Sequence, residues 1–353
     1  MITKILDVSE EPINIDYIKE ASEILKKGGL VAFPTETVYG LGGDATDKEA
    51  SRKIYAAKGR PSDNPLIVHI SKFEQLQQIS KDLPDTAKLL ADAFWPGPLT
   101  MVVNKNKFIP YETTGGLDTV AVRMPNNPVA LALINESGCM IAAPSANTSG
   151  RPSPTKASHV YEDLSGKIDA ILDGGSVDIG LESTIVDLTE DVVTILRPGY
   201  INMDMLRQVV GEVRMDPGIS CGDKDISVGA KPKAPGMRYK HYAPKGDLTI
   251  VSGQEDKVVS AINQLTSQAI AKGLSVGIIA TSASADRYTS GKVLVIGDRE
   301  DEASIAHNLY DILRQFDEED VDVIFSESFA TPQMGQAIMN RLLKAAGQQT
   351  IEV

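Results

Sequence analysis

Basic residues are outnumbered in this chain. Its 353 residues include 35 Lys or Arg against 48 Asp or Glu, which gives a formal net charge of −13. Attraction of the whole surface to nucleic acid or to an anionic membrane needs a positive field, so the composition excludes both. A local basic groove remains compatible with it.

Cysteine and long apolar runs are also scarce. Cys139 and Cys221 lie far apart, and neither belongs to a CxxC or Cys/His cluster, so neither a disulfide framework nor a zinc site is indicated. No run of about 18 apolar residues occurs, and the acidic start, MITKILDVSEEP, has no apolar signal core. We expect a cytoplasmic protein that is neither exported nor membrane-spanning.

Several common catalytic motifs are missing as well. The chain has no GxxxxGKS/T, no GxGxxG and no HExxH, and its histidines, His69, His159, His241 and His307, are scattered. A structural role is the default for each histidine, and His69 is the best functional candidate because its strand begins beside a cationic loop. The P-loop route to nucleotide hydrolysis is therefore excluded.

The segment 34–70 has the composition of an anion site. An apolar strand over 30–33 runs into PTET, and the glycines of GLGG let the backbone approach a ligand closely. A helix then places Lys58 and Arg60 at its end, before Ser62, Asn64 and a second strand over 66–70. Cations in a last helical turn also complement the helix dipole, so each feature alone has an ordinary structural explanation.

Other polar groups follow later strands in the same way. Arg123 ends a strand over 119–123, PSANTSGRPS follows a strand over 140–143, EST opens another strand, and Arg197 ends the strand over 193–196. A Ser/Asn turn often caps its own backbone, which is the structural alternative for PSAN. The repeated position after strands indicates a ligand edge made of cations, hydroxyls and amides. Such a site suits phosphate esters and direct transfer between bound substrates.

The order of predicted elements gives an α/β fold with two domains. Residues 1–211 read as a mixed sheet with interspersed helices, 212–246 as a linker, and 247–353 as a small Rossmann-like parallel sheet without the dinucleotide fingerprint. The linker portion 231–245, KPKAPGMRYKHYAPK, contains no acid. It is either a solvated connector or a segment that folds over an anionic ligand of the first domain.

Taken together, PTETVYGLG, KxRP followed by NPL, PSANxSG, EST and LRPG resemble the YrdC-like domain of threonylcarbamoyl-AMP synthases. The PGMRYKHYAP linker and the α/β tail are similar to the long, two-domain form of that family. The resemblance implies a twisted sheet curled around a concave active site, joined to a Rossmann-like C-terminal domain.

The resemblance also implies a reaction. L-threonine, bicarbonate or carbon dioxide, and ATP give threonylcarbamoyl-AMP and pyrophosphate, and separate partner proteins transfer the threonylcarbamoyl group to the adenosine beside the anticodon of tRNA. Mg²⁺ is expected to arrive with ATP, without a dedicated protein metal site. Direct binding of tRNA is expected to be weak or indirect.

The matching motifs assign residues to this reaction. Catalytic roles fall on Lys58, Arg60, Ser145 and Asn147, with Arg60 and Asn147 orienting the phosphates and the carbamate. ATP contacts fall on Lys58, Ser62, Thr119, Ser145, Ser153, Arg197, Tyr239, His241 and Tyr242. Threonine contacts fall on Thr35, His69, Arg123, Ala143 and Ser183.

Two alternatives come from related domains. A double-stranded RNA-binding module would use the concave surface, but the acidic balance weakens that interpretation. Carbamoyl transfer in hydrogenase maturation uses a similar domain together with zinc-finger cysteines, which this chain lacks.

Overall fold

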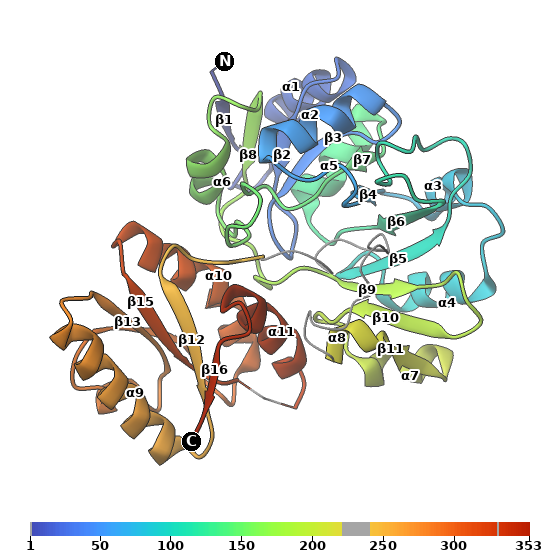
Figure 1. Cartoon of the computed structure of the whole chain (residues 1–353). Coiled ribbons are helices and arrows are strands. Elements are labelled where there is room, and N and C mark those ends of the chain that lie inside the picture. The colour runs from blue at the N-terminus through green and yellow to red at the C-terminus, as the bar shows by residue number, and fades with distance from the viewer. Residues whose placement is uncertain (1, 221–240, 330–331) are drawn as a thin grey trace. The chain divides into compact units, whose positions relative to one another are not determined.

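The computed structural model of the chain describes residues 2–220, 241–329 and 332–353 (Figure 1). The chain forms two compact units: residues 1–149, 153–178 and 182–238 make up the first, and residues 150–152, 179–181 and 239–353 the second, each as far as it is described. Two short segments within the predicted catalytic domain, 1–211, thus belong to the second unit.

The first unit is built on one large mixed sheet. Its described helices are α1 (Ile15–Lys26), α2 (Lys48–Lys58), α3 (Phe73–Ile79), α4 (Asp85–Phe94), α5 (Pro128–Ser137), α6 (Ala157–Leu164), α7 (Met203–Val210) and α8 (Pro217–Ser220). Its described strands are β1 (Lys4–Asp7), β2 (Val31–Phe33), β3 (Gly40–Asp44), β4 (Ile67–His69), β5 (Leu99–Asn104), β6 (Thr119–Arg123), β7 (Ile141–Ala142), β8 (Ala170–Asp173), β9 (Thr184–Asp187), β10 (Val193–Arg197) and β11 (Val213–Met215). These 11 described strands lie in the order β1-β8-β2-β3-β7-β4-β6-β5-β9-β10-β11, with parallel and antiparallel neighbours. The predicted mixed sheet is confirmed.

The sheet extends into the segment assigned to the linker. β11 pairs in parallel with β10, with Val213 opposite Val193, and α8 follows it. Residues 213–220 are therefore regular structure continuous with the first unit. Residues 221–240 of the predicted linker lie outside the described part of the chain.

Local sequence explains where α2 begins and ends. The Asp47 side chain accepts a hydrogen bond from the Glu49 amide at the N-terminus, and Gly59 closes the C-terminus in the left-handed region with φ 64°. The helix therefore stops at Gly59, although Pro61 two residues later would also have ended it. Lys58 is its last residue, as expected.

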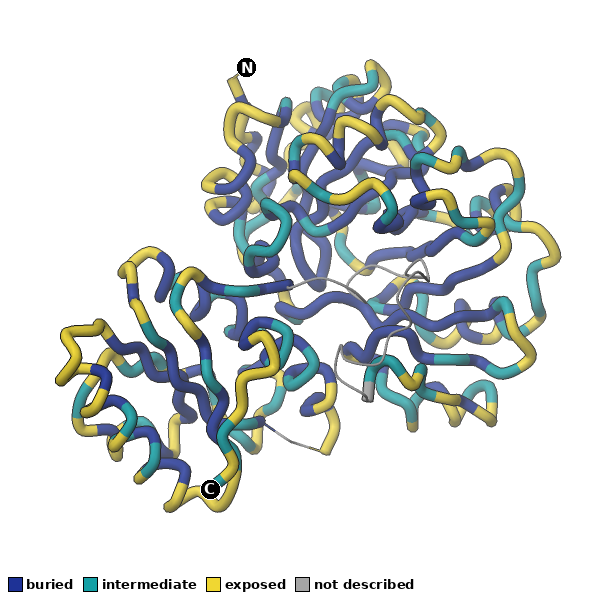
Figure 2. Tube along the Cα trace, in the orientation of Figure 1, coloured by how far each residue is buried: buried dark blue, intermediate teal, exposed yellow. Residues whose placement is uncertain are grey.

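Alternation along the strands gives each face of the sheet its own core. In β2, Ala32 belongs to a cluster with Ile54 of α2, whereas Val31 and Phe33 belong to a cluster with Leu25 of α1. α1, α2 and α5 lie beside this half of the sheet (Figure 1), and Figure 2 shows its strands as buried. The half that contains β4, β6, β5, β9 and β10 provides His69, Thr119, Arg123 and Arg197 of the candidate site.

The glycines after PTETVY form a strand where we expected a ligand loop. Gly40–Asp44 is β3, and a side chain at Gly42 would start 2.8 Å from the Phe33 ring and 2.7 Å from Ile141. β2 and β4 are three strands apart, about 14 Å in a flat sheet, yet the rings of Phe33 and His69 are 5.9 Å apart. The sheet is curled, and Gly42 leaves room for Phe33 to lean across it.

The second unit is a parallel α/β domain, as predicted. Its described elements are β12 (Asp247–Ser252), α9 (Glu255–Ala271), β13 (Val276–Thr281), η1 (Ala285–Arg287), β14 (Lys292–Gly297), α10 (Glu302–Glu318), β15 (Val323–Glu327), α11 (Gly335–Ala345) and β16 (Thr350–Glu352). The strand order is β14-β13-β15-β12-β16, with every pair parallel. Within the described ranges of both units, no helix is long and apolar enough to cross a membrane.

Candidate active site

The predicted site residues lie along two edges of the large sheet. β4 and β6 are parallel and place His69 opposite Arg123, while β5 and β9 begin at that same edge and β10 ends there with Arg197. β2 ends at the other edge, where an isolated bridge between Gly40 and Ser145 joins the chain after PTET to the PSAN loop, while the PTET residues themselves reach Arg123. The two loops thus lie together, and binding of a ligand between them stays a prediction.

Strand alternation places several predicted residues on one face. Thr119 and Arg123 share a face of β6 with Ala121, and His69 shares a face of β4 with Ile67. Ala121 and Ile67 belong to one small apolar cluster. Polar groups and a few apolar side chains thus alternate across this face, which is the usual make-up of a small-molecule site.

Arg123, at the first edge, is a buried cation with only 3% of the residue accessible. Its Nη1 donates to Thr37 Oγ1 at 2.8 Å, its Nε donates to the Gly97 carbonyl at 3.3 Å, and its Nη2 lies 2.7 Å from Glu36 Oε1. A carboxylate therefore already faces the guanidinium predicted to hold the threonine carboxylate.

The hydroxyls around Arg123 are linked to each other. Thr35 Oγ1 lies 2.9 Å from Thr37 Oγ1 and donates to the Val38 carbonyl at 2.7 Å. These contacts fix the PTET segment as a compact turn next to the guanidinium, because the Thr35 hydroxyl also accepts from the amides of Thr37 and Val38. Thr35 is thus brought to Arg123 as the threonine assignment requires.

A second hydroxyl chain runs toward Arg197. Thr100, opposite Arg123 in the ladder, has its Oγ1 2.8 Å from Ser183 Oγ. Arg197 Nε donates to the Ser183 carbonyl at 3.1 Å and Nη2 to Ser183 Oγ at 3.2 Å. Ser183, which is assigned to threonine, therefore links Thr100 to Arg197, the arginine assigned to ATP.

The Lys58 side chain, at the end of α2, is hydrogen-bonded to the PSAN loop. Its Nζ donates to the carbonyl of Ser145 at 2.5 Å, to the carbonyl of Asn147, and to Asn147 Oδ1 at 3.3 Å, and the residue is 1% exposed. Ser145 Oγ donates to the same Asn147 Oδ1 at 2.5 Å. Three of the four predicted catalytic residues are therefore in one hydrogen-bonded cluster.

Arg60 and its neighbours occupy a different part of the first unit. Arg60 Nε donates to the Asn64 carbonyl at 3.2 Å and Nη2 to the Pro65 carbonyl at 3.1 Å. Extending the β4–β6 register back by two residues places Pro65 beside Thr119, so Arg60 and Thr119 lie toward one end of β6 and Arg123 at the other. Ser62 lines a cavity of about 660 Å³ there.

Five further assigned residues lie in different parts of the chain. Ala143 donates its amide to the Ile67 carbonyl at 2.8 Å, and the buried Ser153 donates to Glu182 Oε1 at 2.6 Å. His241 and Tyr242 belong to the second unit, where the Tyr242 ring lies 5.1 Å from Tyr310. Tyr239 lies outside the described residues. The predicted contact of Ala143 with threonine and those of the other four residues with ATP stay predictions.

His69 is held in its neutral form. Burial lowers its pKa to about 3, with the positive charge of Arg123 as the next cause, while Nδ1 lies 3.2 Å from the Ile67 carbonyl. A neutral imidazole supplies one donor and one acceptor, and it does not add charge to the site.

This shift predicts a loss of stability in acid. Because the folded-state pKa lies below the unfolded value of about 6.5, the contribution of His69 is complete above that pH and is lost as the pH falls from 6.5 toward 3. At pH 5 we expect the free energy of unfolding to drop by about 2 kcal/mol relative to pH 7. Urea unfolding at both pH values measures it, and His69→Gln should remove this part of the pH dependence; an unchanged dependence in the variant would contradict the assignment.

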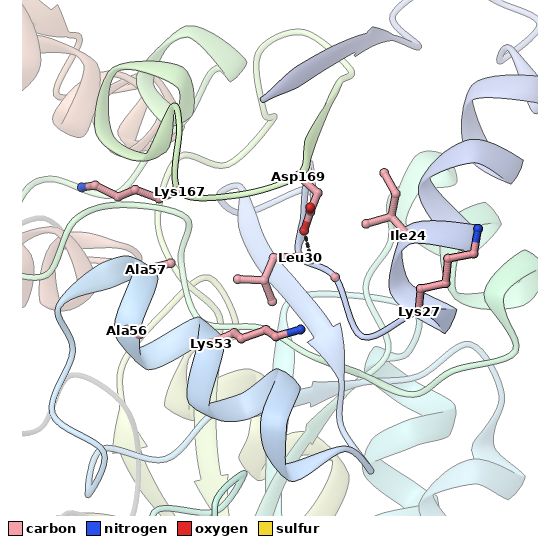
Figure 3. Close-up of a pocket in the computed structure, with 9 residues that line it drawn as sticks. Ile24, Lys27, Leu30, Lys53, Ala56, Ala57, Lys167 and Asp169 are labelled. Atoms are coloured by element: carbon pink, nitrogen blue, oxygen red, sulfur yellow. Dashed lines mark hydrogen bonds between the residues drawn. The ribbon is translucent and has the colours of Figure 1, made fainter. Parts of the chain in front are cut away.

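Another cavity of about 640 Å³ lies between α1 and α2 and is lined by Lys27, Lys53, Lys167 and Asp169 (Figure 3). The three amino groups point in different directions in Figure 3, and Lys53 Nζ donates to the Gly28 carbonyl at 2.6 Å. None of the predicted site residues lines it. Within the described ranges, no group of three or more His, Cys, Asp or Glu is arranged to hold a metal ion.

Sequence reasoning left out three polar residues that the structure places in these contacts: Glu36, Thr37 and Thr100. Glu36 and Thr37 stand within the PTET motif, so an acid between two threonines was a usable signal. No sequence signal pointed to Thr100, because its contact with Ser183 depends on strand pairing. Glu182, the partner of Ser153, belongs to the EST motif and received no role.

Comparison with known proteins agrees with this fold. A family model described as "Telomere recombination" matches residues 23–199, and one described as "Threonylcarbamoyl-AMP synthase, C-terminal domain" matches residues 201–347. The two matches together define a two-domain enzyme of the nucleotidyltransferase kind.

Relatives along the full chain narrow this class. The chain is 47% identical to a threonylcarbamoyl-AMP synthase of Pyrococcus abyssi over 100% of both chains, and 46% identical to one of Bacillus subtilis over 98% of both. The structure of P. abyssi Sua5 complexed with L-threonine matches with a TM-score of 0.93 and 47% identity, covering 99% of this chain and 100% of that one. The chain belongs to the threonylcarbamoyl-AMP synthase family, which acts in tRNA modification.

Proposed function

We propose that this protein condenses L-threonine, bicarbonate and ATP to threonylcarbamoyl-AMP and pyrophosphate. The observation that carries the proposal is the meeting of His69, Arg123, Ser183 and Arg197 at one sheet edge. A buried guanidinium suits a carboxylate, and hydroxyls beside it suit a small polar amino acid. Downstream partner proteins then use the product to modify the adenosine next to the tRNA anticodon, in the cytoplasm.

The reaction brings anions together, which defines what the cations do. A carbamate must meet the α-phosphate of ATP, and fixed positive charge has to offset their repulsion. Lys58, Arg60 and Arg197 are proposed to neutralise the phosphates, and Arg123 to hold the threonine carboxylate. Mg²⁺ accompanies ATP and is held by its phosphates, without a protein cage.

Pyrophosphate release by the purified protein tests the proposal. We expect release from ATP only when both L-threonine and bicarbonate are present, with L-serine as the control amino acid giving little. Release that ignores threonine would contradict the proposed substrate, although a phosphate site would still be needed to explain it.

A further inference from the structure

Glu36 is a buried carboxylate whose hydrogen-bonding capacity is unused. The residue is 4% exposed, and its Oε1 lies 2.7 Å from Arg123 Nη2. Among the described residues, neither carboxylate oxygen accepts a hydrogen bond, and Arg123 Nη2 donates none. Buried carboxylates and guanidinium groups normally have such partners, so this pair is held by charge alone with poor alignment.

An α-amino acid supplies what both members of the pair lack. At neutral pH it carries one carboxylate and one ammonium on the same carbon. Its carboxylate matches Arg123, and its ammonium matches Glu36, so the substrate inserts between two opposite charges without changing the net charge of the pocket. The pair is thus a template for a zwitterion.

Carbamate formation adds a second requirement, because an ammonium nitrogen has no lone pair with which to attack carbon. The proton must first move to a base beside the nitrogen. Lys58 Nζ acts as a donor to the carbonyls of Ser145 and Asn147, so it cannot serve as the base. His69 is a weak base in this place, since burial and Arg123 lower its pKa to about 3. Glu182 is engaged by Ser153 at 2.6 Å.

We propose that Glu36 binds the ammonium group of the amino-acid substrate and accepts its proton. This inference rests on the proposed function. Glu36 and the ammonium give the carboxylic acid and the neutral amine. The amine nitrogen then forms a bond to the bicarbonate carbon, the bond from that carbon to its hydroxyl breaks, and the hydroxyl leaves as water with the second amine proton, which yields the carbamate.

Two measurements on Glu36→Gln test both halves. The first compares binding of L-threonine with binding of 3-hydroxybutanoate, which is threonine without its amino group. Wild-type protein should prefer threonine, and the variant should lose at least about 10-fold of that preference because the charge that holds the ammonium is gone. The second is kcat for pyrophosphate release at saturating threonine, which should fall about 100-fold or more if a general base is lost.

The matched control is Glu327→Gln in the second unit. Glu327 is also a buried glutamate paired with an arginine, 1% exposed and 2.6 Å from Arg299 Nη2, and it accepts from the Tyr288 hydroxyl at 2.8 Å. Its replacement should lower thermal stability and leave the preference for threonine unchanged. Loss of preference in this control as well would overturn the specific role of Glu36.

The remaining outcomes separate this inference from the proposed function. If wild-type release needs threonine and bicarbonate while Glu36→Gln keeps its preference and its kcat, the inference is wrong and the proposed function stands. A raised KM with unchanged kcat also overturns it, because proton transfer is then not lost. If Glu36→Gln does not fold, Glu36→Asp keeps the charge, and it should keep the preference while kcat falls about 10-fold; loss of preference in Glu36→Asp would contradict the proposal.

Discussion

Replacing Lys58 by methionine should lower kcat/KM for pyrophosphate release by about 100- to 1,000-fold, which is the usual cost of removing one preorganised charge from an active site. The stem length stays similar, so the change isolates the ammonium. In the structure, that ammonium orders the PSAN loop through the carbonyls of Ser145 and Asn147 as well as carrying charge.

Lys58→Met should therefore also be less stable than the wild type. Leaving the Ser145 and Asn147 carbonyls without their buried donor costs about 1–3 kcal/mol for each group. Because Lys58 is only 1% exposed, its replacement should disturb the fold as well as the chemistry. Thermal melting with activity measured in parallel checks both effects.

Lys53→Met is the control on the same helix. Lys53 also donates to a backbone carbonyl, that of Gly28, but it is exposed and remote from the PSAN loop. It should retain near wild-type turnover. Equal loss in the two variants, or full activity in Lys58→Met, would count against the catalytic assignment.

The second large effect is expected at Arg123. Arg123→Met leaves Glu36 as a buried carboxylate without its counter-charge, and the loss in the free energy of unfolding should be about 4 kcal/mol. Threonine binding should become undetectable by calorimetry, because the bidentate donor for the substrate carboxylate is gone. Urea unfolding gives the free-energy difference.

A double variant separates the charge effect from the loss of the binding group. Arg123→Met with Glu36→Gln removes both charges, so much of the lost stability should return while threonine binding stays absent. A single Arg123→Met variant as stable as the wild type would show that the 2.7 Å ion pair is not formed in solution.

Long periodic segments were the part of the fold that the sequence predicted well. Apolar residues at helical spacing predict helices over 16–27, 256–272 and 304–316, and the structure has α1, α9 and α10 there within two residues at each end. β1 and β16 were missed because they are short strands with mostly exposed residues, so neither carries an apolar pattern. Their place in a sheet comes from pairing with distant strands.

In the candidate site, too, residues within motifs could be identified from the sequence, whereas contacts between distant segments could not. Lys58, Ser145 and Arg123 were found because each belongs to a motif or to a strand end. The contact between Glu36 and Arg123 could not be found, since it joins segments far apart in the chain and depends on how strongly the sheet curls. The glycines of β3 were interpreted as a ligand loop, because composition alone does not show that Gly42 is needed for packing.

Gly42 has a consequence for how this site tolerates change. The place that a side chain at this position would take is already filled by Phe33 and Ile141, so only a residue without a side chain fits between them. The shape of the binding face is therefore encoded in strand backbone, at a residue that need not touch a substrate. A single added methyl group at position 42 would force Phe33, Ile141 or the strand backbone to move, and Phe33 directly precedes the segment that contacts Arg123.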